Sequence, residues 1–334
     1  MTKSNILISG ALGYIGSAFI EQYSQKYNIF GLDNKFFDSN KETEKKLKNL
    51  IYKDIRDINS NDLKGIDIIV HMSELSNDPM GEVNATVTED ININGTLNLV
   101  SAADKSEIKK FIYMSSCSVY GFNEGGKANE ESILNPLTEY AKAKVANEKF
   151  LLYHKSNYQV KILRNATAFG FSPNHRLDLV VNDLVYNALI SNSINLLSDG
   201  SPIRPIVHIK DISKTISHII DYDENENLLI NVGSNEMNFT IKEIALKISE
   251  LTGIKNISFG NSEGDKRSYE VDFTYLKEKL PNLTLDFTLE KGILELIKNY
   301  KVFQPSENNV RLLKLKYLIE NEKISEKFRF KGLY

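Results

Sequence analysis

The stretch Ile6-Leu7-Ile8-Ser9-Gly10-Ala11-Leu12-Gly13-Tyr14-Ile15-Gly16 decides the fold of this chain. A short apolar run leads into three spaced glycines, and a helical pattern begins at Tyr14. Glycine permits a tight turn from a strand into a helix and lets a phosphate approach the backbone N–H groups closely. The stretch therefore predicts a turn that binds the pyrophosphate of a dinucleotide at the start of a helix, where the helix dipole favours negative charge. The expected contact residues are Gly10, Gly13, Tyr14, Ile15 and Gly16.

Short apolar runs alternate with helical patterns beyond that turn. The strand-like runs lie at 29–32, 50–52, 66–71, 111–114 and 160–163, and the helical patterns at 14–26, 90–105 and 138–154. This alternation is typical of βαβ units. It predicts an α/β protein with a Rossmann fold, in which helices cover both faces of a doubly wound parallel sheet.

The alternation loosens after about residue 165, where prolines become frequent and short strands mix with helices. We expect a dinucleotide-binding Rossmann domain over 1–165, rejoined by about 206–234. The rest of 166–334 is then mainly a smaller α/β C-terminal lobe for the substrate. Its basic, amphipathic tail over 309–330 is expected to dock as a terminal helix.

The composition excludes several other classes of protein. Lys and Arg number 41 and Asp and Glu 44 in 334 residues, so the net charge is −3, and nothing indicates a nucleic-acid or membrane partner. The single cysteine, Cys117, excludes an internal disulfide framework, and the five histidines show no metal-ligand spacing. The N-terminal region lacks the apolar core of a signal peptide. We expect a soluble protein of the reducing cytoplasm, without a metal.

Two carboxylates follow predicted strands on the same side of the sheet. Asp33 ends the second strand, where it can accept hydrogen bonds from both adenosine ribose hydroxyls and would repel a 2′-phosphate, so NAD is favoured over NADP. Asn34, the next residue, is a further candidate for contact with the cofactor. The alternative for Asp33 is an aspartate that caps a helix or stabilises a turn. Asp54 follows the third strand, where it can bond the adenine amine while Ile55 packs on the ring.

The segment Tyr140-Ala-Lys-Ala-Lys144 places a phenol and an ammonium four residues apart. Residues i and i+4 share a helix face, and a nearby positive charge favours the phenolate of a group that ordinarily titrates near ~10. Ser116, after a predicted strand, can hold the substrate hydroxyl whose proton Tyr140 takes. This pattern indicates hydride chemistry at an alcohol carbon, unless the pair is a chance one with a packed Tyr and a solvated Lys.

Taken together, these motifs resemble the extended short-chain dehydrogenase/reductases, and within them the NAD-dependent nucleotide-sugar epimerases and dehydratases such as UDP-glucose 4-epimerase. The likeness spans most of the chain. Besides the glycine turn and the Tyr/Lys pair, it rests on Asp54-Ile55-Arg56-Asp57, Asn94-Gly95-Thr96-Leu97-Asn98-Leu99, Ser115-Ser116-Cys117-Ser118-Val119-Tyr120-Gly121 and the run from Asp199 to Asp211.

The resemblance implies roles for single residues. Ser116, Tyr140 and Lys144 match the catalytic residues, and Lys144 would lower the tyrosine pKa and hold the nicotinamide ribose. Met72 and Ser73 match the loop that passes the cofactor. The two remaining positions are Asn94, which would support that loop, and Glu74, which departs from the small residue usual there. Glu74 either reaches the sugar or points outward.

Four positions in the C-terminal half are implied to bind substrate. Thr167 matches a position that faces the sugar, and Asn182 one that contacts the diphosphate. Arg204 and Arg267 match phosphate-binding positions, because a guanidinium binds phosphate oxygens bidentately. Each arginine is alternatively a surface ion-pair residue.

The reaction implied is reversible oxidation of a sugar C4 hydroxyl by NAD. The 4,6-dehydratases of this class carry Asp-Glu after the catalytic Ser or Thr, whereas Cys117 and Ser118 stand there, which disfavours dehydration. A 4-epimerase is favoured. A C4 dehydrogenase or 4-ketoreductase of an unusual nucleoside-diphosphate hexose or heptose is the alternative, and a non-catalytic NAD-binding regulator is disfavoured by the intact triad. The resemblance also implies carbohydrate biosynthesis, and a homodimer whose four-helix interface uses the helices at 94–105 and 140–154.

Overall fold

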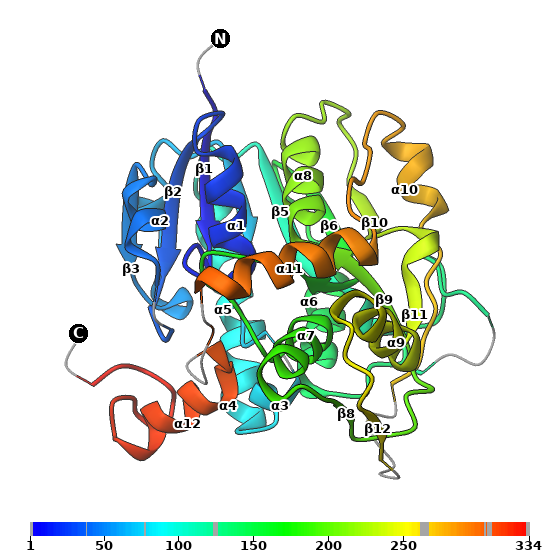
Figure 1. Cartoon of the computed structure of the whole chain (residues 1–334). Helices are drawn as coiled ribbons and strands as arrows, with labels where there is room; N and C mark the ends of the chain where they lie inside the picture. The colour runs from blue at the N-terminus through cyan, green and yellow to red at the C-terminus, as the bar shows by residue number, and fades with distance from the viewer. Residues whose placement is uncertain are drawn as a thin grey trace.

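The computed structural model describes residues 3–37, 39–76, 78–122, 126–260, 267–303, 305 and 309–331. Its centre is a seven-stranded sheet of order β3-β2-β1-β4-β5-β6-β10, in which every pair of neighbours is parallel (Figure 1). The strands are β1 Asn5–Ser9, β2 Asn28–Asp33, β3 Asn49–Tyr52, β4 Ile68–His71, β5 Lys110–Ser116, β6 Gln159–Asn165 and β10 Leu228–Val232. The predicted doubly wound Rossmann fold is confirmed. Its strand order reverses between β1 and β4, which is where such sheets bind ligands.

Helices cover both faces of this sheet because the strand side chains alternate between two apolar cores. Ile6 and Ile8 of β1 face the core that contains α1 (Tyr14–Tyr23) and α8 (Ile209–Ile220), whereas Leu7 faces the core beneath α5 (Gly95–Ala103). The other helices near this sheet are α2 Lys41–Lys45, α3 Asp78–Gly81, α4 Ala85–Glu89, α6 Glu139–Tyr153 and α10 Thr274–Lys279, with the short turns η1 Ile55–Asp57, η2 Ser60–Leu63, η3 Asp90–Asn94 and η4 Cys117–Tyr120.

A smaller α/β region packs around a third core. It contains a three-stranded sheet of order β11-β9-β7 and a two-stranded sheet of β12 and β8. Its elements are β7 Thr167–Phe169, α7 Val180–Ser191, β8 Ile194–Leu196, β9 Ile203–His208, η5 Asn235–Met237, β11 Asn238–Thr240, α9 Ile241–Thr252, β12 Ile257–Phe259 and α11 Leu289–Phe303. Of the region expected to rejoin the first domain, α8 and β10 lie on or in the large sheet, whereas β9 lies in the small one.

The last helix, α12 (Arg311–Glu320), lies beside α3 (Figure 1). Leu315 and Leu318 are buried in the core that also contains Ile55 and Ile91. The C-terminal segment is therefore docked on the large domain, although its helix ends at Glu320 rather than continuing to 330. Among the described helices, we find none with the length and apolarity needed to span a bilayer.

Candidate active site

The glycine turn joins β1 to α1 at the point where the strand order reverses. Gly10 has φ +74°, and a Cβ atom on it would lie 2.9 Å from the carbonyl oxygen of Met72. A Cβ atom on Gly16 would overlap the carbonyl oxygens of Gly10 and Ala11. Only glycine fits these two positions, so the turn stays narrow against the loop after β4.

The N-terminus of α1 suits a diphosphate. Its N-cap, Gly13, provides no side-chain cap, and the first turn carries no acidic residue, so its backbone N–H groups and dipole favour a bound anion. The phenol of Tyr14 donates to the carbonyl of Gly170 at 2.7 Å and lies buried in the protein. The cradle fits NAD, and backbone contacts of Tyr14 and Ile15 with the cofactor remain predictions.

The carboxylates of Asp33 and Asp54 both form hydrogen bonds or ion pairs within the protein. The carboxylate of Asp33 accepts from the N–H groups of Leu12 (3.0 Å) and Lys35 (2.8 Å), which ties the end of β2 to the glycine turn. Burial raises the pKa of this carboxyl, although the hydrogen bonds from the backbone and the charge of Arg311 act to lower it. Asp54 caps η1 and pairs with Arg56 at 2.7 Å.

The neighbours Asn34 and Ile55 lie at the same end of the sheet. The Asn34 amide oxygen accepts from the N–H of Phe36 at 3.2 Å. Ile55 is buried against Gly95, where an added Cβ atom would lie 2.5 Å from its Cγ2. Adenosine contacts for these residues remain predictions.

The loop after β4 is held by Asn92, not by Asn94. The amide oxygen of Asn92 accepts from the N–H of Leu75 at 2.8 Å, and its amide nitrogen donates to the carbonyl of Leu75 at 3.2 Å. Asn92 is fully buried. Asn94 is exposed, and its one described side-chain hydrogen bond is to Asp90, at 3.1 Å. The assignment of Asn94 as the supporting residue was wrong. The loop it would support, with Met72 and Ser73, lies between β4 and α3.

Ser116, Tyr140 and Lys144 come together as predicted. Thr138 caps α6 by accepting from the N–H of Ala141 at 3.2 Å, and this places Tyr140 in the first turn. Ser116 ends β5, its hydroxyl accepts from the N–H of Ser118 at 3.1 Å, and it lies near enough to the Tyr140 phenol to lower the pKa of that phenol. Lys144, one turn further along α6, lies with its Nζ 5.4 Å from the centre of the Tyr140 ring.

The protonation of Tyr140 differs from the prediction. Burial raises the pKa of this phenol well above its ordinary value, and the negative charge of Glu74 raises it further. The opposing effects come from Arg176 and from Ser116. The expected lowering by Lys144 is wrong for the free chain, because the ammonium faces a carboxylate instead.

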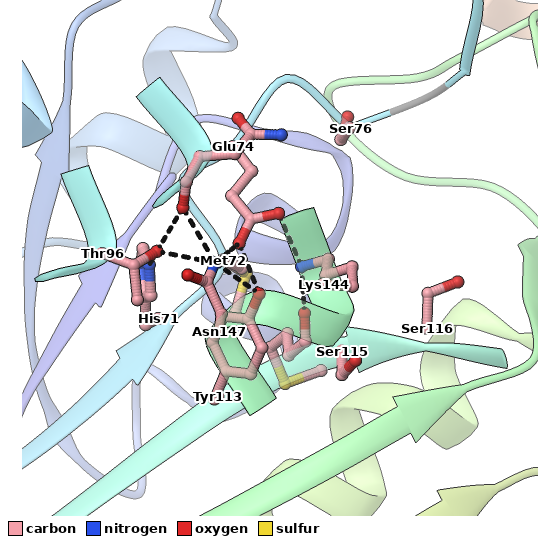
Figure 2. A network of polar contacts seen from close by, with 12 residues as sticks. His71, Met72, Glu74, Ser76, Thr96, Tyr113, Ser115, Ser116, Lys144 and Asn147 are labelled. Atoms are coloured by element: carbon pink, nitrogen blue, oxygen red, sulfur yellow. Dashed lines mark hydrogen bonds and ion pairs between the residues drawn. The ribbon is translucent and has the colours of Figure 1, made fainter. Parts of the chain in front are cut away.

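That carboxylate belongs to Glu74, which turns inward (Figure 2). Its Oε2 lies 2.8 Å from Nζ of Lys144, and its Oε1 accepts from the Tyr113 phenol at 2.7 Å and from the Asn147 amide at 3.3 Å. The side chain of Glu74 is 2% exposed. The outward orientation considered for Glu74 is wrong, and its contact with a sugar is a prediction.

The residues predicted to bind the substrate differ in their exposure and in their contacts. Thr167 is partly exposed in β7. The guanidinium of Arg204, in β9, donates to the carbonyls of Ile203 (2.8 Å) and Arg267 and lies over the ring of Tyr269. Burial lowers the pKa of Arg267. Asp265 and Lys266, which adjoin Arg267 in the sequence, lie outside the described residues.

Asn182 does not fit its assignment. It is fully buried in α7, where its amide oxygen accepts from the N–H of Gly170 at 2.9 Å and its amide nitrogen donates to the carbonyl of Arg176 at 2.9 Å. The predicted contact with a diphosphate is wrong, because the amide is committed to the backbone between β7 and α7.

Arg176 is a site residue that the motifs did not reveal. Its guanidinium pairs with Asp178 at 2.8 Å, donates to Ser76 at 3.0 Å, and is among the charges that act on Tyr140. It stands in a segment without periodicity, where only the close spacing of Arg and Asp suggests an ion pair. Cys117 and Ser118 are buried, and burial raises the pKa of the Cys117 thiol.

Comparisons with known proteins agree with this geometry. Residues 6–233 match the family described as NAD dependent epimerase/dehydratase family. A Bacillus subtilis protein named uncharacterized UDP-glucose epimerase YtcB is 28% identical over 269 residues, which are 75% of this chain and 83% of that protein. The UDP-glucuronic acid 4-epimerase from Bacillus cereus, solved with UDP-glucuronic acid and NAD, has a TM-score of 0.78 at 22% identity over 90% of this chain and 99% of its own. DesIV, a dTDP-glucose 4,6-dehydratase from Streptomyces venezuelae, gives 0.79 at 22% identity over 89% and 97%.

The fold and the site define a Rossmann-fold oxidoreductase of the extended short-chain dehydrogenase/reductase class. The family match covers more than half of the chain, so the protein belongs to the NAD-dependent epimerase/dehydratase family. It is an enzyme, and its cofactor is NAD.

Proposed function

We propose that this enzyme oxidises the C4 hydroxyl of a nucleoside-diphosphate sugar and returns the hydride to the opposite face of the sugar, as a 4-epimerase. What supports the proposal is the joint position of Ser116, Tyr140 and Lys144 at the end of β5, beside the glycine turn. Relatives of similar fold are named as 4-epimerases of UDP-sugars.

In this mechanism Tyr140 takes the proton of the C4 hydroxyl, and Ser116 hydrogen-bonds the same oxygen and orients it. NAD held at the glycine turn would supply the hydride acceptor and donor. Lys144 has three N–H donors, and Glu74 and the carbonyl of Met114 are its described partners, so a third remains to hold the cofactor ribose. Arg204 and Arg267 bind the diphosphate, and Thr167 faces the sugar.

A 4-ketoreductase or C4 dehydrogenase is the second candidate. The substrate of the ketoreductase would be a 4-keto form of an unusual hexose or heptose.

We also propose a cytoplasmic homodimer that acts in carbohydrate biosynthesis. The exposed apolar side chains of α6, at Phe150, Leu152 and Tyr153, suit the interface implied for this helix with α5. A monomer at micromolar concentration in light scattering would contradict the dimer.

The deciding experiment is incubation of the purified protein with UDP-, GDP-, CDP- and dTDP-sugars. Inversion at C4 with no net NADH identifies an epimerase, and accumulating NADH or keto sugar identifies a dehydrogenase. The Tyr140→Phe variant should keep its fold and bound NAD while turnover falls by at least about 100-fold. Unchanged turnover would refute Tyr140 as the base.

A further inference from the structure

Glu74 is a buried carboxylate that the proposed reaction does not use. It forms an ion pair with Lys144, and the two side chains are 2% and 4% exposed. Removing both charges from water costs free energy that their attraction barely offsets, so such a pair adds little to stability. Its place beside Tyr140 instead gives it an effect on the reaction.

The effect follows from the position of Lys144 between two phenols. Its Nζ lies 4.7 Å from the centre of the Tyr113 ring and 5.4 Å from that of Tyr140. Without Glu74, a full positive charge would act on Tyr140 at this distance. With a carboxylate 2.8 Å from the ammonium, the two charges largely cancel at the phenol.

The other ionisable groups around the site are already balanced or neutral. On β4, burial lowers the pKa of His71 to about 3, so its ring is neutral. On α6, Glu148 pairs with Arg164 of β6 at 2.7 Å. Between β7 and α7, Arg176 pairs with Asp178 at 2.8 Å. On β5, the phenol of Tyr113 donates to Glu74, and burial raises the pKa of this phenol, with a further increase from the charge of Glu74.

We propose that Glu74 is a positioning residue that cancels the charge of Lys144 and keeps Tyr140 protonated until oxidised NAD brings a positive charge into the site. The inference rests on the proposed function, since Tyr140 must be the base. Glu74 contacts Lys144 and Tyr113 directly and reaches the reacting atoms only through its charge.

The Glu74→Gln variant tests this directly, because it keeps the shape of the side chain while the negative charge is lost. Its amide oxygen can accept from Lys144 in the place of Oε2, and its amide nitrogen can donate to the phenol oxygen of Tyr113 in the place of Oε1. Removing a negative charge favours the phenolate, so Tyr140 should ionise at a pH lower by about one to two units. The near-ultraviolet absorbance of phenolate, titrated in the cofactor-free protein, measures this without turnover. Subtracting the Glu74→Gln/Tyr140→Phe double variant isolates Tyr140. The alkaline rise of the rate of alcohol oxidation should move toward acid by the same amount.

Glu148→Gln is the matched control, because it removes another buried carboxylate from the same region without touching Lys144. It should lower the melting temperature and leave the Tyr140 titration in place. If Glu74→Gln fails to fold, Glu74→Ala supplies the small residue usual in similar enzymes. A Glu74 variant that folds and leaves both titrations unshifted overturns the inference. Absence of turnover with every nucleotide sugar would instead overturn the proposed function, and the phenolate titration, which needs no substrate, would still decide the role of Glu74.

Discussion

Replacing Asn92 by alanine should loosen the loop that carries Glu74. The change removes the acceptor for the Leu75 N–H (2.8 Å) and the donor to the Leu75 carbonyl (3.2 Å), and both groups are buried. Each buried group left without a partner costs about 1–3 kcal/mol, so the free energy of unfolding should fall by about 3 kcal/mol. In a chain of this length that lowers the melting temperature by about 5 °C.

Asn94→Ala is the matched control, because Asn94 lies two residues along the same segment and makes one exposed bond to Asp90. Its loss should change stability by no more than about 0.5 kcal/mol. Thermal unfolding followed by circular dichroism compares the two variants, and NAD titration calorimetry should show weaker binding for Asn92→Ala alone. Equal destabilisation by both variants would refute the assignment of Asn92 as the residue that holds the loop.

Two further predictions concern the C-terminal lobe and the last helix. Burial raises the pKa of Asp183 to about 6, above its ordinary 3.8, so the folded chain favours the protonated carboxyl. The contribution of this carboxyl to the free energy of unfolding is therefore fully present below pH 3.8 and is lost as the pH rises through 6. Asp183→Asn should therefore melt higher than the natural chain at pH 7.5, and the difference should close near pH 4; a constant difference would contradict it. Leu315→Ala, at a fully buried position of α12, should cost about 2–4 kcal/mol in chemical denaturation, whereas Leu313→Ala, 45% exposed, should cost at most about 0.5. Similar losses in both would argue against docking of α12.

The sequence was sufficient for the parts of the molecule that local patterns control. The glycine turn and the strands β1, β2, β5 and β6 follow from glycine spacing and short apolar runs. Tyr140 and Lys144 share a face because a helix fixes the direction of side chains four residues apart. These features depend on neighbours in the chain, which the sequence displays.

The site residues that were misplaced depend on contacts between distant segments. Asn92 and Asn94 lie two residues apart on η3, so their side chains point to nearly opposite sides of this helix, and only its packing against distant segments decides that Asn92 faces the core. Asn182 is committed to Gly170 and Arg176 by the path of the segment before α7. The inward turn of Glu74 requires Tyr113 of β5 and Lys144 of α6 as partners, and no local pattern joins the three.

The charges around Tyr140 bear on how its proton transfer is linked to the oxidation state of the cofactor. Lys144 faces Glu74, and Arg176 faces Asp178, so each buried cation near the phenol has its own carboxylate. In the absence of a net positive charge, a buried phenol remains protonated. In the role that we propose for Tyr140, oxidised NAD held at this site would add the positive charge of its nicotinamide ring and would favour the phenolate, whereas reduced NAD would not. Without that charge, Tyr140 would be the acid form that a ketone requires. A site balanced in this way would suit reversible hydride transfer, because the oxidation state of the cofactor would select whether Tyr140 acts as base or as acid.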